Sequence, residues 1–255
     1  MEENKMKKLL KKVLCLSLVA IITLFAVGCG GNENDSSGNK SELESQSVNK
    51  TSDGVAKPED YMTLTVENDK SVEIANSQNA DIKVADIPTE INGEKVVAIS
   101  DNAFNNYKNL DEVIVPGTVE KIGELSFALN HNLKKVTLNE GVKEIGMECF
   151  SQDTALVEVS LPSTLKTISV GAFLYCVSLE KVIIPNGVES IEEAAFSRCE
   201  KLKEIHIPSS VTFIQNGSRE KSSAFNYDEN VTIYAPKGSY AEKYAKQENI
   251  KFVAE

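Results

Sequence analysis

The sequence has few of the residues that most often carry catalysis or hold a metal ion. Its 255 residues include only two histidines, His131 and His206, and no HExxH, GxSxG, phosphate-loop or paired-cysteine metal motif. Acidic side chains are abundant, but abundance in an acidic chain does not create the paired carboxylates of a glycosidase. We therefore predict a protein that is not an enzyme and that uses no cofactor and no metal.

Long hydrophobic runs are also scarce, and the one exception lies at the N-terminus. Residues 1–12 carry five lysines, and residues 13–27 are almost entirely apolar. This run is short for a membrane span, and a charged region followed by an apolar region is typical of a signal peptide. No other stretch is apolar enough to span a membrane.

The apolar run ends at Ala26-Val27-Gly28-Cys29, where small residues precede a cysteine. This junction resembles the lipobox of bacterial lipoproteins, although Ala26 stands where leucine is usual. The resemblance implies that residues 1–28 are a lipoprotein signal peptide and that Cys29 is lipidated and becomes the new N-terminus. The alternative is ordinary secretion with an incidental cysteine.

The chain also lacks a basic surplus. Removing residues 1–28 takes away five lysines and two glutamates, which leaves 22 basic and 36 acidic residues and a net charge of −14. Such a charge repels nucleic-acid phosphates and anionic lipid head groups, so we expect no nucleic-acid partner. Contact with the membrane would come through the N-terminal lipid.

Residues 29–57 comprise the cysteine and a stretch of Ser, Asn, Gly, Glu and Lys with almost nothing to bury. We predict a disordered tether with an end-to-end distance of roughly 30 Å. The folded part would thus be exported, lipid-anchored to the cell membrane and displayed at the cell surface.

A 23-residue repeat organises the rest of the chain. A phenylalanine recurs in every repeat, with six extra residues before the last one. Three further columns keep the same spacing: one of leucine, one of valine or isoleucine, and one of isoleucine. The phenylalanines are Phe104, Phe127, Phe150, Phe173, Phe196 and Phe225. The pattern predicts a mainly β solenoid of about six coils over residues 100–235, because one such coil cannot bury its apolar face alone.

Within each repeat, apolar residues alternate just before a position that is often proline, as in Leu110-x-x-Val113-x-Val115-Pro116. This predicts a short strand in each coil, and stacked coils would align these strands into a parallel sheet. We expect residues 58–99 to form a β hairpin cap and an irregular first coil. Residues 236–255 would form a second cap with a short helix, opened by the capping box Ser239-x-x-Glu242.

The motif AF-x-x-C-x-x-L-x-x-[VI]-x-[IL]-P-x-x-[VL]-x-x-I, as in residues 172–191, resembles the BspA-like leucine-rich repeats of bacterial surface proteins. The resemblance implies a right-handed solenoid, no catalytic residues, and surface roles such as adhesion. In the broader leucine-rich repeat pattern, Asn or Cys follows the strand. The matching bend positions here are Thr118, Gly141, Thr164, Gly187 and Ser210, whose hydroxyls are candidates to satisfy the backbone.

Two outward columns on the strands are informative. One alternates in charge and has a structural explanation as cross-strand pairs: Glu112, Lys135, Glu158, Lys181 and Glu204. The other is small and mildly apolar, and we expect it to be the ligand-facing surface: Ile114, Thr137, Ser160, Ile183, His206 and Thr232. The insertion at 215–224 is a second candidate, through Asn216, Arg219 and Lys221, although a tolerated surface loop is the simpler interpretation.

Two cysteines share one repeat position. Cys176 and Cys199 would lie on adjacent coils, where they could form a disulfide or remain as reduced core thiols. We favour the thiols, and Cys149 has no obvious mate.

Together these observations predict a surface lipoprotein that recognises an extracellular protein or glycan. The alternative is a scaffold of an envelope complex or a module that captures an extracellular polysaccharide.

Overall fold

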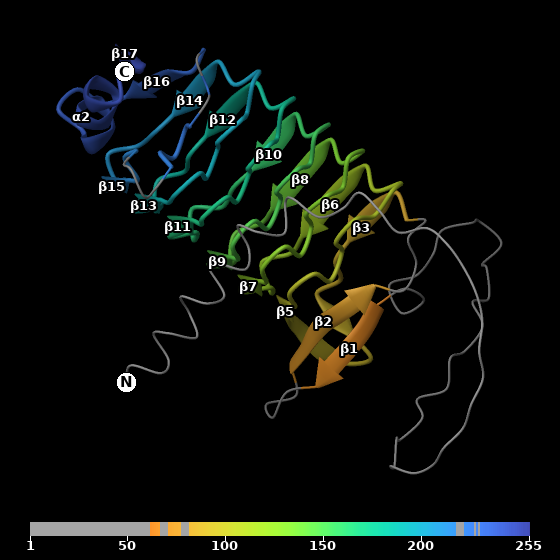
Figure 1. Cartoon of the computed structure of the whole chain (residues 1–255). Helices are drawn as coiled ribbons and strands as arrows, with labels where there is room; N and C mark the ends of the chain where they lie inside the picture. The colour runs from red at the N-terminus through yellow and green to blue at the C-terminus, as the bar shows by residue number, and fades with distance from the viewer. Residues whose placement is uncertain (1–61, 67–70, 78–81, 218–221, 227, 229) are drawn as a thin grey trace, which may run out of the picture. The chain divides into compact units, whose positions relative to one another are not determined.

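The computed structural model describes residues 62–66, 71–77, 82–217, 222–226, 228 and 230–255, and these form a parallel β solenoid (Figure 1). The predicted signal peptide, Cys29 and tether lie outside the described residues. Each repeat forms one coil with three sides, namely two short strands and a turn that carries the phenylalanine. Six coils carry a phenylalanine, and an irregular coil precedes them, as the repeat predicted.

The first side of the coils forms what we call the primary strand face. Its eight strands are β3 (Val84–Asp86), β6 (Glu112–Val115), β8 (Lys135–Leu138), β10 (Glu158–Ser160), β12 (Lys181–Ile183), β14 (Glu204–His206), β16 (Thr232–Ala235) and β17 (Lys251–Ala254). The pairing is parallel and keeps the 23-residue register from β6 to β8, from β8 to β10, and from β12 to β14.

The second side forms the secondary strand face. Its strands are β5 (Glu94–Ile99), β7 (Lys121–Ile122), β9 (Glu144–Ile145), β11 (Thr167–Ile168), β13 (Ser190–Ile191) and β15 (Phe213–Ile214). At the N-terminal end, β1 (Met62–Val66) and β2 (Ser71–Ser77) form an antiparallel hairpin, and β2 pairs in parallel with β5. The short strand β4 (Glu90–Ile91) pairs with β5 across the turn Asn92-Gly93.

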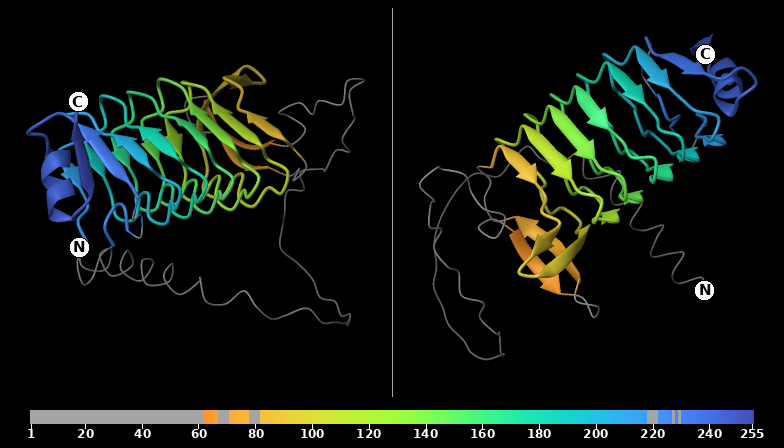
Figure 2. Two further views of the ribbon diagram at one scale, coloured as in Figure 1. Left: turned by 90° about the horizontal axis from the view of Figure 1, so that it is seen from above. Right: turned by 180° about the vertical axis from the view of Figure 1, so that it is seen from behind.

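The C-terminal segment contains the helix α2 (Tyr240–Gln247) and β17 (Figure 2). Ser239 is the N-cap, and its side chain accepts the N–H of Glu242, which confirms the predicted capping box. Glu242 in turn accepts the N–H of Gly238 and pairs with Lys246. Tyr244 and Ala245 are buried, and α2 contacts β15, β16 and β17, so this helix covers apolar surface next to the last coil.

The core is a continuous column in which the phenylalanine rings stack. From Phe104 to Phe225, successive ring centroids lie 5.0–5.6 Å apart, and the ring planes differ by 6–8°. All six phenylalanines are buried. Truncating a buried phenylalanine to alanine typically costs about 3–5 kcal/mol, so each ring is a substantial part of what joins neighbouring coils.

In the turns around five of the six phenylalanines, Phe104 to Phe196, the residues two before and two after the ring have left-handed backbone. Leu125 and Leu129, two residues before and after Phe127, have φ values of 56° and 66°. Leucine rarely adopts this conformation, which costs about 1–2 kcal/mol per residue. The compensation is a backbone ladder, since the N–H groups of Leu125, Phe127 and Leu129 each donate to a carbonyl of the next coil.

Both strand faces are interrupted between the same two coils. The primary face divides into the sheets β3-β6-β8-β10 and β12-β14-β16-β17, and the secondary face divides between β9 and β11. Figure 1 shows these neighbours further apart than the others. The turn ladder continues across the boundary, where Glu148, Phe150 and Gln152 donate to Val170, Ala172 and Leu174. We call this boundary the seam.

Candidate recognition surface

The charged column on the primary strand face forms most of the expected ion pairs. Lys135 Nζ lies 3.6 Å from Glu112 and 3.5 Å from Glu158, and Lys181 Nζ lies 3.0 Å from Glu204. The expected pair between Glu158 and Lys181 is absent from the described residues, because these two side chains face each other across the seam. Exposed pairs of this kind contribute little to stability, so the column mainly gives the face a mixed charge.

The small and mildly apolar column is present beside the charged one, with one correction. Ile114 pairs with Thr137, Thr137 with Ser160, and Ile183 with His206, as expected. The prediction for Thr232 was wrong, because β16 aligns Thr232 with Glu204 and Tyr234 with His206. Thr232 is only 7% exposed, and Tyr234 takes its place in the column.

His206 is held by its neighbours and is not a free surface side chain. Its ring stacks on Tyr234 with the centroids 4.8 Å apart, and Nδ1 lies 2.9 Å from Glu255 Oε2. Glu204 Oε2 lies 3.9 Å from Nε2 on the other side. His206 Nε2 is enclosed and makes no hydrogen bond within the described residues, so the ring is fixed by Tyr234 and Glu255.

Ile183 is the most exposed large apolar side chain in the described part of the chain, with 62% of its surface accessible. It lies on β12, at the edge of the seam. On the opposite edge, Val157 is 52% exposed, and the inward-facing Val159 and Leu161 are only partly buried. Their equivalents in the next coil, Val182 and Ile184, are fully buried, so the seam opens the apolar interior toward the primary strand face.

The insertion at 215–224 is only partly described. Ala224 N–H donates to the Gln215 carbonyl, which closes the base of the loop, and Ser222 N–H donates to the Glu193 carboxylate. Asn216 is half-buried at the loop's start, and its Oδ1 is enclosed without a partner. Arg219 and Lys221 lie outside the described residues, so their role as binding residues stays a prediction.

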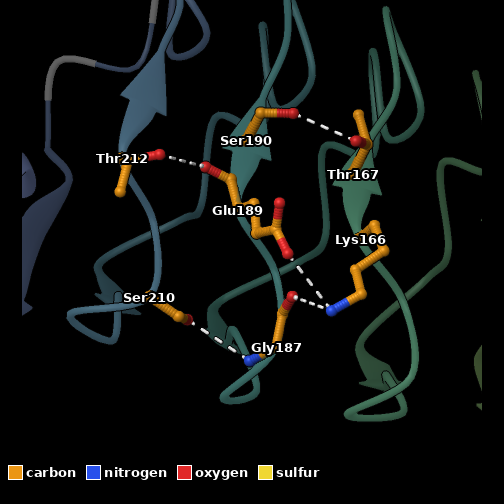
Figure 3. Close-up of polar contacts among 7 residues, drawn as sticks. All are labelled: Lys166, Thr167, Gly187, Glu189, Ser190, Ser210 and Thr212. Atoms are coloured by element: carbon orange, nitrogen blue, oxygen red, sulfur yellow. Dashed lines mark hydrogen bonds and ion pairs between the residues drawn. The ribbon is translucent and has the colours of Figure 1, made fainter.

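On the secondary strand face, polar side chains link one coil to the next (Figure 3). Lys166 Nζ lies 3.2 Å from Glu189 and contacts the Gly187 carbonyl, while Ser190 bonds Thr167 at 3.0 Å. At the bend, the Ser210 hydroxyl accepts the Gly187 N–H. These contacts join three successive coils along the secondary strand face.

Two of the three bend hydroxyls, those of Thr164 and Ser210, satisfy backbone groups as the repeat suggested, while Thr118 Oγ1 is enclosed and has no partner among the described residues. Thr164 Oγ1 accepts the N–H of Gly141 at 2.9 Å and donates to the Val142 carbonyl at 2.8 Å. Gly141 itself has φ +121°, and an added Cβ would lie 2.1 Å from the Gly117 carbonyl oxygen. Along the bend column, glycine therefore alternates with a residue that carries a hydroxyl, because the close approach of neighbouring coils leaves no room for a side chain at the glycine.

The three cysteines in the described coils are free and buried, as favoured from sequence. The Cys176 and Cys199 thiols each donate to a phenylalanine carbonyl of the preceding coil. Burial raises the pKa of each of these thiols well above its usual range. They are therefore poor nucleophiles, and their role is to satisfy backbone groups inside the stack.

Two further observations concern other kinds of site. Within the described residues, no group of three or more His, Cys, Asp or Glu side chains is arranged to hold a metal ion. The part of the chain that the structure describes contains no helix long and apolar enough to cross a membrane.

Comparison with known proteins agrees with this architecture. The family described as "BspA type Leucine rich repeat region" matches residues 97–231 in six copies, which is more than half of the chain. No curated protein matches the sequence significantly.

Solved structures that are similar include the following two. A leucine-rich repeat protein of T. pallidum has a TM-score of 0.59 and 20% identity over 77% of this chain and 97% of its own, a likeness that shows the fold alone. A leucine rich cell surface protein of Faecalibacterium prausnitzii A2-165 has a TM-score of 0.52 and 26% identity over 68% of this chain. The match covers 52% of that second protein, so this chain corresponds to about half of it.

Proposed function

Because the chain belongs to the BspA-type leucine-rich repeat family, we propose that it is a cell-surface interaction module that recognises a protein or glycan ligand without catalysing a reaction. Surface display is supported by the Faecalibacterium relative, which is described as a cell surface protein. Recognition is supported by the fold, since a solenoid offers an extended side-chain surface and little enclosed space.

The observation that carries the proposal is the apolar surface at the seam of the primary strand face. The outward-facing Ile183 and Val157 are more than half exposed, and the inward-facing Val159 and Leu161 at the same boundary are only partly buried. Exposed apolar residues that gather in one place, and are rimmed by polar groups, mark interaction sites. Here the rim is the alternating charged column, which suits a ligand of mixed or no net charge.

We further propose that Cys29 carries the lipid that holds the module at the membrane. Small residues before this cysteine and the apolar run that precedes them support lipidation. Metabolic labelling with a palmitate analogue tests it: the chain should incorporate label and fractionate with membranes, and Cys29→Ser should do neither. Labelling that persists in Cys29→Ser would contradict the assignment.

Recognition is tested by presenting the purified protein to extracellular matrix proteins and to a glycan array, with heat-denatured protein as the control. A saturable interaction that denaturation abolishes supports the proposal. If nothing binds, and crosslinking in intact cells joins the chain to envelope proteins, the scaffold function replaces it.

A further inference from the structure

One position of the repeat, three residues after each phenylalanine, joins successive coils through side-chain hydrogen bonds inside the core. Asn130 Oδ1 accepts the N–H of Tyr107, and Asp153 Oδ1 accepts the N–H of Asn130 at 2.8 Å. We call this column the internal ladder. Its members are Tyr107, Asn130, Asp153, Cys176, Cys199 and Asp228, all of them buried.

Besides accepting a backbone N–H, a side chain of the internal ladder also donates a hydrogen bond to the preceding coil. Asn130 Nδ2 donates to the Phe104 carbonyl at 3.1 Å. Cys176 and Cys199 donate through Sγ to the carbonyls of Phe150 and Phe173, both at 3.2 Å. In all three cases the acceptor is the phenylalanine carbonyl 26 residues earlier. At Asn130, Cys176 and Cys199, the repeat therefore places a hydrogen-bond donor that reaches the phenylalanine carbonyl of the preceding coil.

Asp153 and Asp228 occupy this position without an obvious donor. An ionised carboxylate only accepts hydrogen bonds. Asp153 Oδ2 is enclosed and has no partner among the described residues. Neither oxygen of Asp228, a residue only 8% exposed, makes a hydrogen bond of normal geometry there, although the Cys199 N–H is near enough to affect the pKa of the carboxyl. Leaving such an oxygen charged and unpaired in the core would be costly.

We propose that Asp153 and Asp228 are protonated carboxylic acids in the folded protein. Each would use its own proton to donate a hydrogen bond within the internal ladder, and these two bonds would stabilise the stacking of the coils. By the repeat register, the acceptors are the carbonyls of Phe127 and Phe196. Each already accepts one hydrogen bond, from Asn130 Nδ2 and from the Cys199 N–H, and has a second lone pair for the carboxylic acid. At this repeat position, the carboxylic acid would thus have the same role as the amide of Asn130 and the thiols of Cys176 and Cys199, because each group offers a hydrogen-bond donor.

The charges around the two groups fit this protonation. Facing Asp153 are the thiols of Cys149 and Cys176, which are themselves neutral. Burial raises the pKa of Asp153 well above its usual range, and the N–H of Asn130 opposes this only in part.

Asp228 faces the Cys199 backbone, Glu200 and Arg198, and it lines a cleft together with Glu248 and Lys251. Burial raises the pKa of Asp228 to about 8, with Glu200 adding to the rise and the Cys199 N–H and Arg198 opposing it. The last coil therefore responds to pH in the neutral range.

The pH dependence has a definite sign. A carboxyl whose pKa is raised by folding stabilises the native state fully below the unfolded pKa of about 3.9, and this contribution is lost as the pH rises through the folded pKa. For Asp228 the loss extends from about pH 4 to about pH 8. For Asp153, whose pKa is also raised by burial, the loss has the same direction.

Thermal unfolding of the full chain between about pH 4 and pH 9 tests the proposal, with Asp153→Asn, Asp228→Asn and the double variant beside the wild type. Asparagine supplies an N–H donor that does not titrate. The wild-type melting temperature should fall as the pH rises, each single variant should reduce the fall, and the double variant should remove most of it. Asp111→Asn, which removes an exposed partner of Lys134, is the matched control and should keep the wild-type profile.

Carboxyl 13C NMR gives a direct readout of the two protons. Two aspartate resonances of the wild type should titrate well above the usual range of an aspartate carboxyl, and each should disappear in one of the variants. If Asp153→Asn does not fold, Asp153→Cys places at 153 the donor that positions 176 and 199 already use. The proposal is overturned if every aspartate titrates below about pH 5, or if the asparagine variants change stability equally at all pH values.

Discussion

Phe150 and Phe173 stack with ring centroids 5.5 Å apart and planes 7° from parallel, across the one coil boundary where both strand faces lose their pairing. At the other boundaries from β6 to β16, strands on the primary face and rings in the core join the coils together. At the seam, the phenylalanine turns carry most of the connection. The seam therefore divides the strand pairing of the array into two blocks, residues 82–160 and 166–255. These blocks remain joined by the chain crossing, the phenylalanine turns and the hydrogen bond from the Ser169 hydroxyl to the Ile145 carbonyl.

Amide hydrogen exchange should show the seam directly. The N–H groups of Lys203 and Glu204 donate to the Glu180 carbonyl, at 2.9 and 3.3 Å. Their equivalents one coil earlier, in Glu180 and Lys181, have no such bond to the coil before them. We predict that these two amides exchange faster than those of Lys203 and Glu204. Equal protection at both places would contradict the interruption.

Truncating a ring at the seam should separate the two blocks. Phe150→Ala removes a buried ring and should cost about 3–5 kcal/mol of unfolding free energy. Because strand pairing does not support this boundary, we expect unfolding in two transitions, monitored by urea titration with two probes. Phe127→Ala, one coil earlier, is the matched control and should lower stability by a similar amount in a single transition.

The close approach of coils at the bend predicts an unequal response to alanine at two glycines. Gly141→Ala would place a Cβ 2.1 Å from the Gly117 carbonyl oxygen in a left-handed backbone, so we expect a loss of at least ~2 kcal/mol. Gly93 also has a positive φ, of 84°, but nothing lies within 4 Å of its added Cβ. Gly93→Ala should cost only the conformational strain, about 1 kcal/mol. Chemical denaturation of the two variants compares them, and equal losses would show that contact at the bend does not matter.

The hydroxyl at the bend gives a further test. Thr164→Val keeps the shape of the side chain but removes the acceptor for Gly141 N–H and the donor to Val142. Leaving these backbone groups unpaired should cost about 1–3 kcal/mol. Thr212→Val is the control, since the Thr212 hydroxyl makes only a 3.5 Å contact on an exposed strand. Equal losses of stability in Thr164→Val and Thr212→Val would mean that water can hydrogen-bond the backbone groups of Gly141 and Val142 in place of the Thr164 hydroxyl.

Sequence reasoning recovered the fold because one strict period set it. The phenylalanine column and its apolar companions predicted which side chains are inside, and the capping box predicted where α2 begins. The same reasoning misplaced Thr232. His206 lies ten residues after Phe196, but Tyr234 lies nine residues after Phe225, so only strand pairing shows that Tyr234 follows His206.

The seam and the internal ladder were harder to predict. Glu158 and Lys181 continue the alternation of charge across the seam, so nothing in their column signals the interruption. Asp228 shares the internal ladder with Cys176 and Cys199, but the insertion hides the spacing. Counting three residues from Phe225 would have found it.

The central claim is that the apolar part of the primary strand face binds the ligand. A binding titration of Ile183→Glu against a ligand found in the screen tests it most directly, with Phe213→Glu as the control. Phe213 is also exposed and apolar, at 40%, but it lies on the secondary strand face. The account predicts that Ile183→Glu weakens binding at least tenfold, about 1.4 kcal/mol, while Phe213→Glu leaves it unchanged. Unchanged binding by Ile183→Glu, with both variants folded, would contradict it.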